Sequence, residues 1–192
     1  MPKRSFDAEE ANMNTLDTPL DIQLPLTDET VSRLRAGMTV RLSGPCYTAR
    51  DAAHKRLTEM LSRGEPLPIP LQGQCIYYVG PSPAPEGRPI GAAGPTSSYR
   101  MDAYTPRLLG LGLKGMIGKG ARSQAVIDAI RQEHAVYFGA VGGAAALQAR
   151  HITASELIAF PDLQSEAIRL LTLDRFPAVV LIDSLGQLFP NG

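Results

Sequence analysis

The stretch AVVLID, residues 178–183, contains the longest run of large apolar residues in the chain. A strand that is apolar on both faces is expected in the middle of a sheet, where other elements cover it on each side. The run is far shorter than the roughly 20 apolar residues that a membrane-spanning helix needs. The sequence therefore predicts a central, buried strand here and no membrane span.

Two further strands and two helices follow from similar patterns. CIYYVG (75–80) and AVYFGA (135–140) are rich in the aromatic and β-branched residues that favour strands. Residues 52–63 carry apolar side chains at the spacing of one helical face, and Ser123 can cap a second helix over 124–133. Strands and helices alternate irregularly, which is typical of a layered α/β domain.

The other predicted elements are shorter. Residues 20–27 alternate apolar and polar side chains, as an edge strand does, and residues 38–42 are expected to form another strand. A short helix is predicted from Thr27 to about Leu34, and a further helix from about Met101 to Leu111.

The chain has 192 residues, and residues 1–17 are polar and without periodicity. We interpret 1–17 as a flexible N-terminal arm and 18–192 as a single domain. A domain of this size buries roughly 70% of the surface of its unfolded chain and needs no covalent staples. The N-terminal residues lack the apolar core of a signal peptide, so we expect a soluble, cytoplasmic protein.

The charged residues balance, with 19 Lys and Arg against 19 Asp and Glu. Such a chain has no overall field that would attract nucleic acid or an acidic membrane. It has two cysteines, Cys46 and Cys75, and three histidines, none at zinc-site spacing. We expect no nucleic-acid partner and no metal site built from this chain alone, and we interpret both cysteines as small core residues.

A first candidate binding loop precedes the helix predicted over 52–63. Gly44-Pro45 predicts a turn that delivers Arg50 to the N-terminus of this helix, where unpaired N–H groups favour an anion. The alternative is that Thr48 or Asp51 only caps the helix and that Arg50 is solvated.

The second candidate is GPTSSYRMD, residues 94–102. It repeats the order of a Gly-Pro pair, hydroxyl residues and an arginine. The planar guanidinium of Arg100 can hold a carboxylate through two hydrogen bonds, and a hydroxyl such as that of Thr96 can act as a base once its proton is removed. The alternative is an ordinary turn, because Ser and Thr often follow Pro in turns.

The third candidate is IGKGARS, residues 117–123. Glycines on both sides of Lys119 allow the backbone to approach a ligand that the ammonium group can reach. The stretch is not a Walker A loop, because Ala121 occupies the position of the required Ser or Thr. The alternative is a simple left-handed turn.

Taken together, the three loops offer Arg50, Arg100 and Lys119, with Thr96 among them. Three cations in glycine-rich loops are suited to a dianion such as a dicarboxylate. No metal-ligand set and no Ser-His-Asp order accompanies them, and His54 is placed by the helical pattern on the polar side of its helix, in a structural role. The loops therefore look like half of a site.

These motifs resemble the C-terminal domain, or separate β subunit, of the class I iron–sulfur fumarate hydratases and L-tartrate dehydratases. The resemblance runs from about residue 20 to 189. The stretches that carry it are TARDAAHKRL (48–57), GPTSSYRMD (94–102), GKGARS (118–123) and FPAVVLIDSLGQLF (176–189).

The resemblance implies a swivelling β/β/α layered domain and an α subunit that holds a [4Fe–4S] cluster through three cysteines. One iron of that cluster would act as a Lewis acid on the substrate hydroxyl. The two cysteines of this chain cannot supply three thiolates, so the cluster is expected on the partner. The length suits a free-standing β subunit, and the αβ unit can dimerise further.

The implied reaction is the reversible hydration of fumarate to L-malate, a step of the tricarboxylic acid cycle, by a hydro-lyase that is active only with its α subunit. Thr96 would be the base that removes a proton from carbon, activated by an aspartate of the partner. The substrate would be bound by Arg50, Arg100, Lys119, Ser97 and Gly118.

Two positions depart from the family pattern, and the substrate is open. Ser97 stands where the family often has threonine, which keeps a hydroxyl, and Cys46 receives no role. L-Tartrate or mesaconate-type hydro-lyases are alternatives within the class. An alternative from another class is a non-catalytic dicarboxylate-binding or regulatory module.

Overall fold

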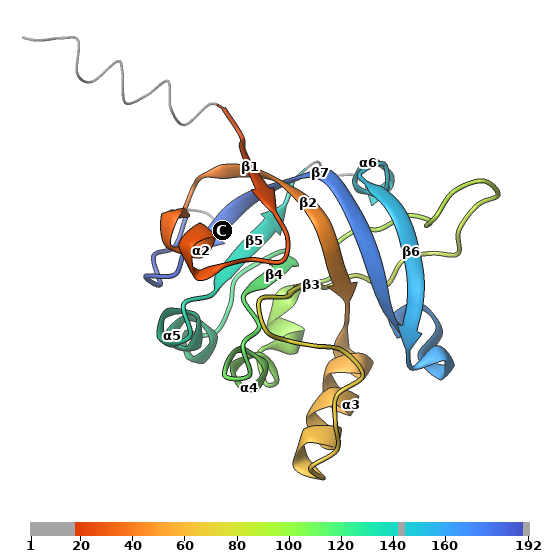
Figure 1. The fold of residues 1–192 in the computed structure, drawn as a ribbon, viewed down its shortest axis with the longest axis horizontal. Coiled ribbons are helices and arrows are strands. Elements are labelled where there is room, and N and C mark those ends of the chain that lie inside the picture. Colours follow the sequence, from red (N-terminus) through yellow and green to blue (C-terminus); the bar gives the residue numbers. More distant parts are fainter. Residues whose placement is uncertain (1–17, 142–144, 190–192) are drawn as a thin grey trace, which may run out of the picture.

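The computed structural model describes residues 18–141 and 145–189, and the centre of this part of the chain is a sheet that closes into a barrel of five strands (Figure 1). The barrel closes because the last strand pairs with β5 on one side and β2 on the other. Its strands are β2 (Thr39–Thr48), β3 (Cys75–Tyr77), β4 (Gly115–Gly118), β5 (Val136–Ala140) and β7 (Ile168–Ile182). Two more strands extend the sheet, β1 (Leu20–Gln23) beside β2 and β6 (Ile152–Ala159) beside β7.

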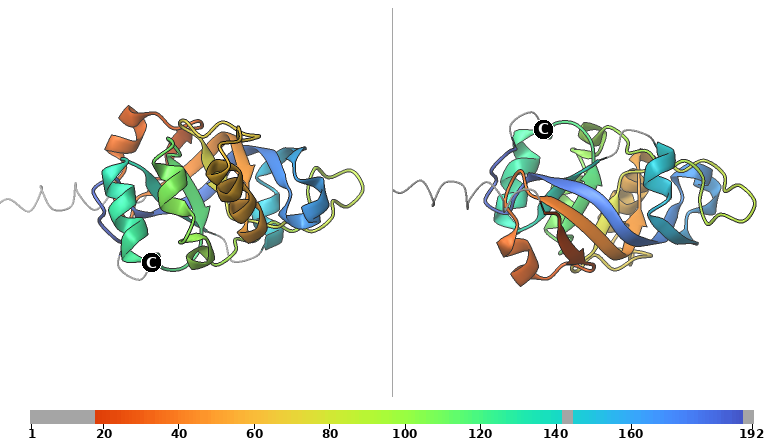
Figure 2. Two further views of the ribbon diagram at one scale, coloured as in Figure 1. Left: turned by 90° about the horizontal axis from the view of Figure 1, so that it is seen from below. Right: turned by 90° about the horizontal axis from the view of Figure 1, so that it is seen from above.

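The sheet is mixed. Strands β1 to β5 run parallel to their neighbours, whereas β7 is antiparallel to β2, β5 and β6. Residues 178–182 form the end of β7. This part of β7 pairs with β2 on one edge and with β5 on the other, so the predicted central strand is confirmed. Figure 2 shows β7 and β2 crossing the molecule side by side.

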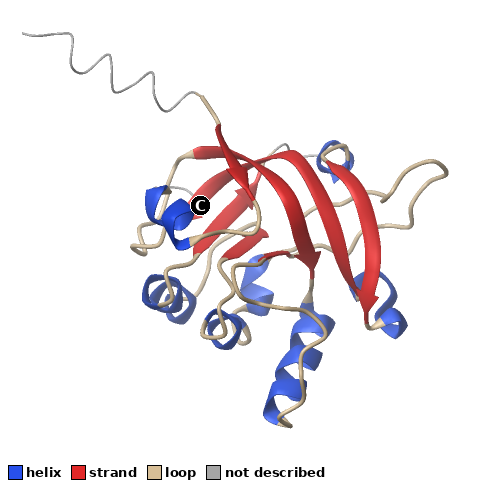
Figure 3. Ribbon diagram, viewed as in Figure 1, coloured by secondary structure: helices blue, strands red, loops and turns tan. Residues whose placement is uncertain are grey.

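The described helices are short and lie mainly on one side of the strands (Figure 3). Thr27 and Ser123 each accept a hydrogen bond from the first helical turn that follows, which confirms the predicted cap at Ser123 and the helix predicted to begin at Thr27. The bounds are α2 (Asp28–Arg33), α3 (Asp51–Ser62), α4 (Thr105–Leu109), α5 (Gln124–Gln132) and α6 (Ala145–Ala149), with 3₁₀ turns η1 (Ser98–Met101) and η2 (Pro161–Glu166).

Alternate residues of the barrel strands feed two separate hydrophobic clusters, because successive side chains of a strand point to opposite faces. Tyr77 and Phe138 belong to the cluster that contains residues of β1, β2, β7 and α2. Ile76 and Tyr137 belong to the other, which contains residues of α3, α4 and α5. The strands are therefore buried on both faces, as their continuous apolar runs require.

The turn predicted at Gly44-Pro45 is wrong, because both residues lie inside β2. The register of β2 against β7 shifts between Leu42 and Gly44, and Gly44 has a left-handed φ of 115°. A glycine that admits this conformation allows a bulge within the strand. The chain therefore bends here without leaving the sheet.

Two other expectations need correction, and one strand was not predicted. The helix predicted over 101–111 is replaced by η1 and the shorter α4. The strand β6 has no counterpart among the predicted elements, because its exposed outer face gives it no long apolar run. His54 does not lie on a polar side of α3, since it is completely buried.

The predicted arm, residues 1–17, lies outside the described residues. The α/β class is confirmed, while the layered swivelling arrangement and the single-domain boundary stay predictions. Across the described ranges, none of the helices has both the length and the hydrophobicity needed to cross a bilayer.

Candidate active site

Three loops at one edge of the sheet carry the predicted binding residues. Strands β2, β3 and β4 run parallel, so their carboxyl ends meet at the same edge. Arg50 follows the end of β2 by two residues, and Lys119 follows the end of β4 directly. The backbone N–H of Thr96 donates to the carbonyl of Tyr78, just beyond β3, at 2.7 Å. The three loops are therefore brought to one edge, as the sequence predicts.

The first part of the site is the arginine cluster, which consists of Arg50, Asp51, Arg100 and Glu166. Asp51 Oδ1 lies 2.7 Å from Arg100 Nε, and Asp51 Oδ2 lies 3.7 Å from Arg50 Nε. Glu166 Oε1, from η2, lies 3.3 Å from Arg50 Nε on its other side. One carboxylate thus connects the two arginines that were predicted to bind substrate.

The arginine cluster has unused hydrogen-bonding capacity. Arg50 Nε and Asp51 Oδ2 are buried and make no hydrogen bond to any described residue. Buried polar atoms without a hydrogen bond are costly, but the ion pairs of Arg50 Nε with Asp51 and Glu166 compensate the charge here. Gly80 makes room for the arginine, since a Cβ there would lie 2.6 Å from Arg50 NH1.

The capping alternative for Thr48 and Asp51 is wrong. Arg50 is itself the N-cap residue of α3, and no side chain accepts a capping hydrogen bond there. The hydroxyl of Thr48 donates to the carbonyl of Ala167 at 3.2 Å and accepts from the backbone N–H of Arg169 at 3.0 Å. Thr48 therefore connects β2 to the start of β7 and does not cap α3, whose N-cap residue is Arg50.

His54 contacts the backbone of the arginine cluster at Arg50. Its Nδ1 is 2.9 Å from the backbone carbonyl of Arg50, which can only accept, so Nδ1 donates. Burial lowers the pKa of His54 to about 4, which leaves the ring neutral near pH 7. The ring packs edge-on against Tyr78, with centroids 5.3 Å apart. Its role is to hold the backbone at Arg50.

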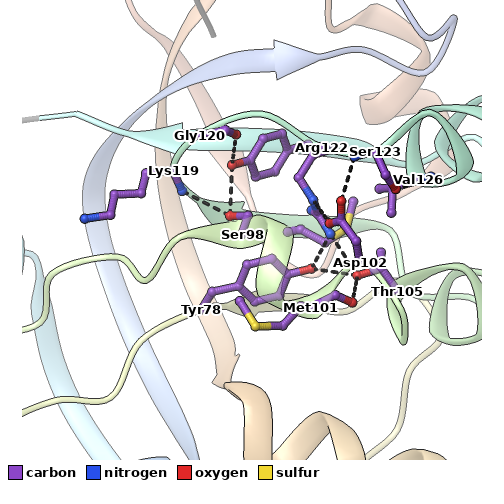
Figure 4. A network of polar contacts seen from close by, with 12 residues as sticks. Tyr78, Ser98, Met101, Asp102, Thr105, Lys119, Gly120, Arg122, Ser123 and Val126 are labelled. Atoms are coloured by element: carbon purple, nitrogen blue, oxygen red, sulfur yellow. Dashed lines mark hydrogen bonds and ion pairs between the residues drawn. The ribbon is translucent and has the colours of Figure 1, made fainter.

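The second part of the site joins the loops of Thr96 and Lys119 (Figure 4). Ser98 accepts a hydrogen bond from the backbone N–H of Lys119 at 3.1 Å, and its own N–H donates to the Lys119 carbonyl at 2.9 Å. Tyr137 OH lies 2.9 Å from Ser98 Oγ and 2.9 Å from the carbonyl oxygen of Gly120. We call the hydroxyl pair of Ser98 and Tyr137 the serine–tyrosine joint.

Behind this joint lies the Arg122 network. The side chain of Arg122 is fully buried, and its Nε donates to Asp102 Oδ1 at 2.7 Å. Its NH2 donates to Thr105 Oγ1 at 2.8 Å, and Asp102 Oδ2 accepts from the backbone N–H of Ser123. Burial alone lowers the pKa of Arg122, but Tyr78 and the hydrogen bond to Asp102 raise it above its ordinary value. The network ties η1 to the start of α5.

Three residues that hold the loops were not predicted from the sequence: Asp102, Arg122 and Tyr137. Asp102 and Arg122 stand inside two of the quoted motifs, where their charge could have drawn attention to them. Tyr137 looks like any aromatic residue of a strand, and only the fold brings its hydroxyl to Ser98.

The remaining predicted site residues also lie at this edge. Thr96 and Ser97 are half-buried, and Ser97 forms an isolated parallel bridge with Lys119. Gly118 is buried, and a Cβ there would overlap Ser98 Oγ. The roles of these residues in binding or catalysis stay predictions.

The residues of this chain do not fit an iron–sulfur cluster. Cys46 and Cys75 are the only cysteines, and both are fully buried, with Cys46 Sγ donating to the Cys75 carbonyl at 3.5 Å. Burial raises the pKa of the Cys75 thiol, which disfavours the thiolate that iron requires. Among the described residues, no group of three His, Cys, Asp or Glu side chains could hold a metal ion.

The described part of the chain is thus a mixed α/β domain that gathers cationic loops at the carboxyl ends of parallel strands. The model of one family, described as "Fumarase C-terminus", matches residues 2–191, and the chain belongs to this family. Its relatives include both complete fumarate hydratases and a separate subunit.

Two relatives are much longer than this chain. "Fumarate hydratase 2" of Leishmania major is 35% identical over 185 residues, which cover 94% of this chain and 33% of that protein. "Fumarate hydratase class I, aerobic" of Salmonella typhimurium is 37% identical over 174 residues, which cover 88% of this chain and 30% of that protein. The chain thus spans about a third of these relatives.

A third relative has nearly the same length. "Putative L(+)-tartrate dehydratase subunit beta" of Methanocaldococcus jannaschii is 34% identical over 168 residues. The alignment covers 84% of this chain and 86% of that protein.

Proposed function

We propose that this chain is the β subunit of a heteromeric iron–sulfur hydro-lyase that reversibly hydrates fumarate to L-malate. The observation that carries the proposal is the position of three cations at one edge of the sheet. Arg50 and Lys119 follow the ends of the parallel strands β2 and β4, and Arg100, in η1, is paired with Asp51 beside Arg50. Its membership of the fumarase C-terminal family supports the reaction class.

The arginine cluster supplies the binding of one substrate carboxylate. Asp51 and Glu166 face the Nε side of the two guanidinium groups, so the outer N–H groups of Arg50 and Arg100 can receive an anion. Each guanidinium presents a planar fork that matches a carboxylate. The ammonium group of Lys119 then serves the second carboxylate or the hydroxyl group, with Ser97 and Gly118 beside it.

In the direction of dehydration, Thr96 takes a proton from carbon 3 of malate. The electron pair of the broken C–H bond forms the double bond, and the hydroxyl group leaves carbon 2 with the electron pair of the C–O bond. Thr96 must first give its own hydroxyl proton to a base, which we assign to the partner chain. The base then gives that proton to the departing hydroxide, which becomes water, so the products are fumarate and water.

We assign the [4Fe–4S] cluster to the partner, an α subunit, because the two buried cysteines of this chain are a poor match for it. This chain contributes Thr96 and the cations Arg50, Arg100 and Lys119 to the reaction. Dependence on the α subunit, further dimerisation of the αβ unit, the layered swivelling architecture and a cytoplasmic location belong to the same proposal.

A second substrate has support from a specific observation. A relative of nearly the same length as this chain, 86% of which is covered, carries the name of a tartrate dehydratase subunit, whereas the two fumarate hydratases described above are about three times as long. L-Tartrate is therefore the first alternative to fumarate, and a mesaconate-type diacid is the next.

The test is to produce the chain together with its cluster-bearing partner without oxygen and to follow the ultraviolet absorbance of fumarate. We expect fumarate to be consumed and malate formed. A complex with a full cluster that is inactive on fumarate, tartrate and mesaconate would falsify the proposal. If the isolated chain instead binds a dicarboxylate tightly by calorimetry and no partner co-purifies, the non-catalytic binding module is the better account.

A further inference from the structure

We infer that Ser98 and Tyr137 are positioning residues that fix Lys119 relative to Thr96. This inference rests on the proposed function, because it assigns these residues to the same site. Figure 4 shows the arrangement, with Ser98 between the Lys119 backbone and the ring whose hydroxyl also reaches Gly120. Neither residue is expected to touch the substrate.

The first argument is that Ser98 binds both polar groups of the Lys119 backbone. Its hydroxyl accepts from the Lys119 N–H at 3.1 Å and its N–H donates to the Lys119 carbonyl at 2.9 Å. Ser98 lies two residues after Thr96 and is fully buried. The catalytic hydroxyl and the binding ammonium are therefore carried by two segments joined at one residue.

The second argument is the close fit at Gly118. A Cβ at this position would overlap Ser98 Oγ and would lie 3.0 Å from a ring carbon of Tyr78. The serine hydroxyl thus occupies the space that any side chain at Gly118 would need. Gly118 is required for the approach of the two loops, which is a reason for this glycine that does not involve a ligand.

Tyr137 connects the serine–tyrosine joint to the sheet. It lies in β5, which pairs with β4 immediately before the loop of Lys119. Its hydroxyl reaches both Ser98 and the carbonyl of Gly120, so it spans the turn that contains Lys119. Burial raises the pKa of Tyr137 to about 12, so its hydroxyl keeps its proton at neutral pH.

The joint restrains the short segment between β4 and the Arg122 network, where Ser97 also bridges Lys119. Gly120 has a left-handed φ of 80°, and a Cβ there would meet no atom within 4 Å. Glycines on both sides of a lysine leave its backbone many conformations. Without the joint, the ammonium group would lose its fixed relation to Thr96, and a displacement of about 1 Å can cost up to 100-fold in rate.

The test is a double-mutant cycle with Ser98→Ala and Tyr137→Phe in the complex with the cluster-bearing partner. Each single substitution is expected to lower kcat/KM by about 10-fold, mainly through kcat if positioning for the transition state is lost. Because both act through one joint, the double variant should lose much less than the roughly 100-fold of independent effects. Fully multiplicative losses, or unchanged kcat/KM, overturn the inference.

The matched control is Tyr77→Phe. Tyr77 is another buried tyrosine, in β3, and its hydroxyl bonds to the Ala93 carbonyl and to Gln148 rather than to the joint. We expect a similar loss of stability but a kcat/KM within about twofold of the wild type. If Tyr77→Phe lowers kcat/KM as much as Tyr137→Phe does, the effect is general destabilisation and the inference is wrong.

A second measurement separates this inference from the proposed function. Hydrogen exchange of the Lys119 amide, measured on the full chain, is expected to accelerate by at least about 10-fold in Ser98→Ala, which removes its acceptor. Tyr137→Phe should accelerate it as well, although Tyr137 does not bind that amide. If the wild-type complex is inactive on every diacid, the proposed function fails. If Tyr137→Phe leaves the exchange of Lys119 unchanged, the joint itself is refuted.

Discussion

Two arginine–aspartate pairs of equal length, 2.7 Å, lie in very different surroundings. In the arginine cluster, the side chains of Arg100 and Asp51 are 43% and 28% exposed. In the Arg122 network, those of Arg122 and Asp102 are 0% and 13% exposed. The first pair is partly exposed to solvent, whereas the second is held by further hydrogen bonds to Thr105 and to the backbone.

The difference shows how burial decides the role of a pair. A buried charge that loses its partner is strongly destabilising, so a buried pair is fixed in place. An exposed pair contributes little to stability and can rearrange. The buried pair therefore holds the loops, and the exposed pair is the one that we propose for binding the substrate. The segment 96–102 contributes to both pairs, through Arg100 and Asp102.

The largest effect is expected for Thr96→Ala, at the start of this shared segment. Loss of a general base lowers kcat by about 10²- to 10⁴-fold, while KM and the free energy of unfolding should change little, because Thr96 is only half-buried. The measurement is steady-state kinetics of the complex. A kcat close to that of the wild type would refute the role of Thr96 as base.

The second prediction concerns the buried pair. Arg122→Met leaves Asp102 partly buried without its cation, and we expect a loss of about 3–5 kcal/mol in the free energy of unfolding, measured by urea denaturation. The matched control is Arg41→Met, because Arg41 pairs with Asp21 at the same 2.7 Å but with 27% and 66% exposure. That control should cost at most about 1 kcal/mol. Equal losses in both variants would contradict the contrast drawn from burial.

The third prediction uses His54, beneath the arginine cluster. Its pKa falls from 6.5 to about 4 on folding because of burial, so folding favours the neutral ring. The stabilising effect is complete above pH 6.5 and is lost as the pH falls toward 4. Between pH 7.5 and 4.5 the wild type should lose about 2.5 kcal/mol more than His54→Gln.

The control for this experiment is His134→Asn. His134 has a φ of 50°, and asparagine tolerates this left-handed conformation. His134 is exposed, so this variant controls for the loss of a histidine outside the core, and its free energy of unfolding at pH 7.5 should stay within about 0.5 kcal/mol of the wild type. A wild type and a His54→Gln variant with parallel pH profiles would show that His54 does not titrate as proposed.

The parts of the fold that local patterns determine were predictable. The cap at Ser123, the helix that begins after Thr27 and the helix over 52–63 depend on neighbouring residues, and the structure confirms them. Closure of the barrel was not predictable, because it depends on the pairing of β7 with strands far away in the sequence. A glycine before a proline is also ambiguous, since the same Gly44 can form a turn or a bulge.

The site was predictable to a similar degree. Glycine, hydroxyl and cationic residues in short loops drew attention to the segments of Arg50, Arg100 and Lys119, which the structure brings together, while their roles stay predictions. The residues that hold these loops were missed, because a buried Arg122 looks like a surface arginine until the fold is known. His54 was misplaced for the same reason, since periodicity alone does not show what covers the side of a helix.

The smallest effect is expected for Arg100→Lys, which tests the exposed pair directly. Lysine keeps the charge beside Asp51 but loses the planar fork, so KM should rise by about 10-fold while the free energy of unfolding changes by less than about 1 kcal/mol. Arg33→Lys, at an exposed arginine of α2, is the matched control and should leave KM unchanged. An unchanged KM in Arg100→Lys would mean that the outer face of the arginine cluster does not bind the carboxylate, and a large loss of stability would mean that this pair holds the fold as the Arg122 pair does.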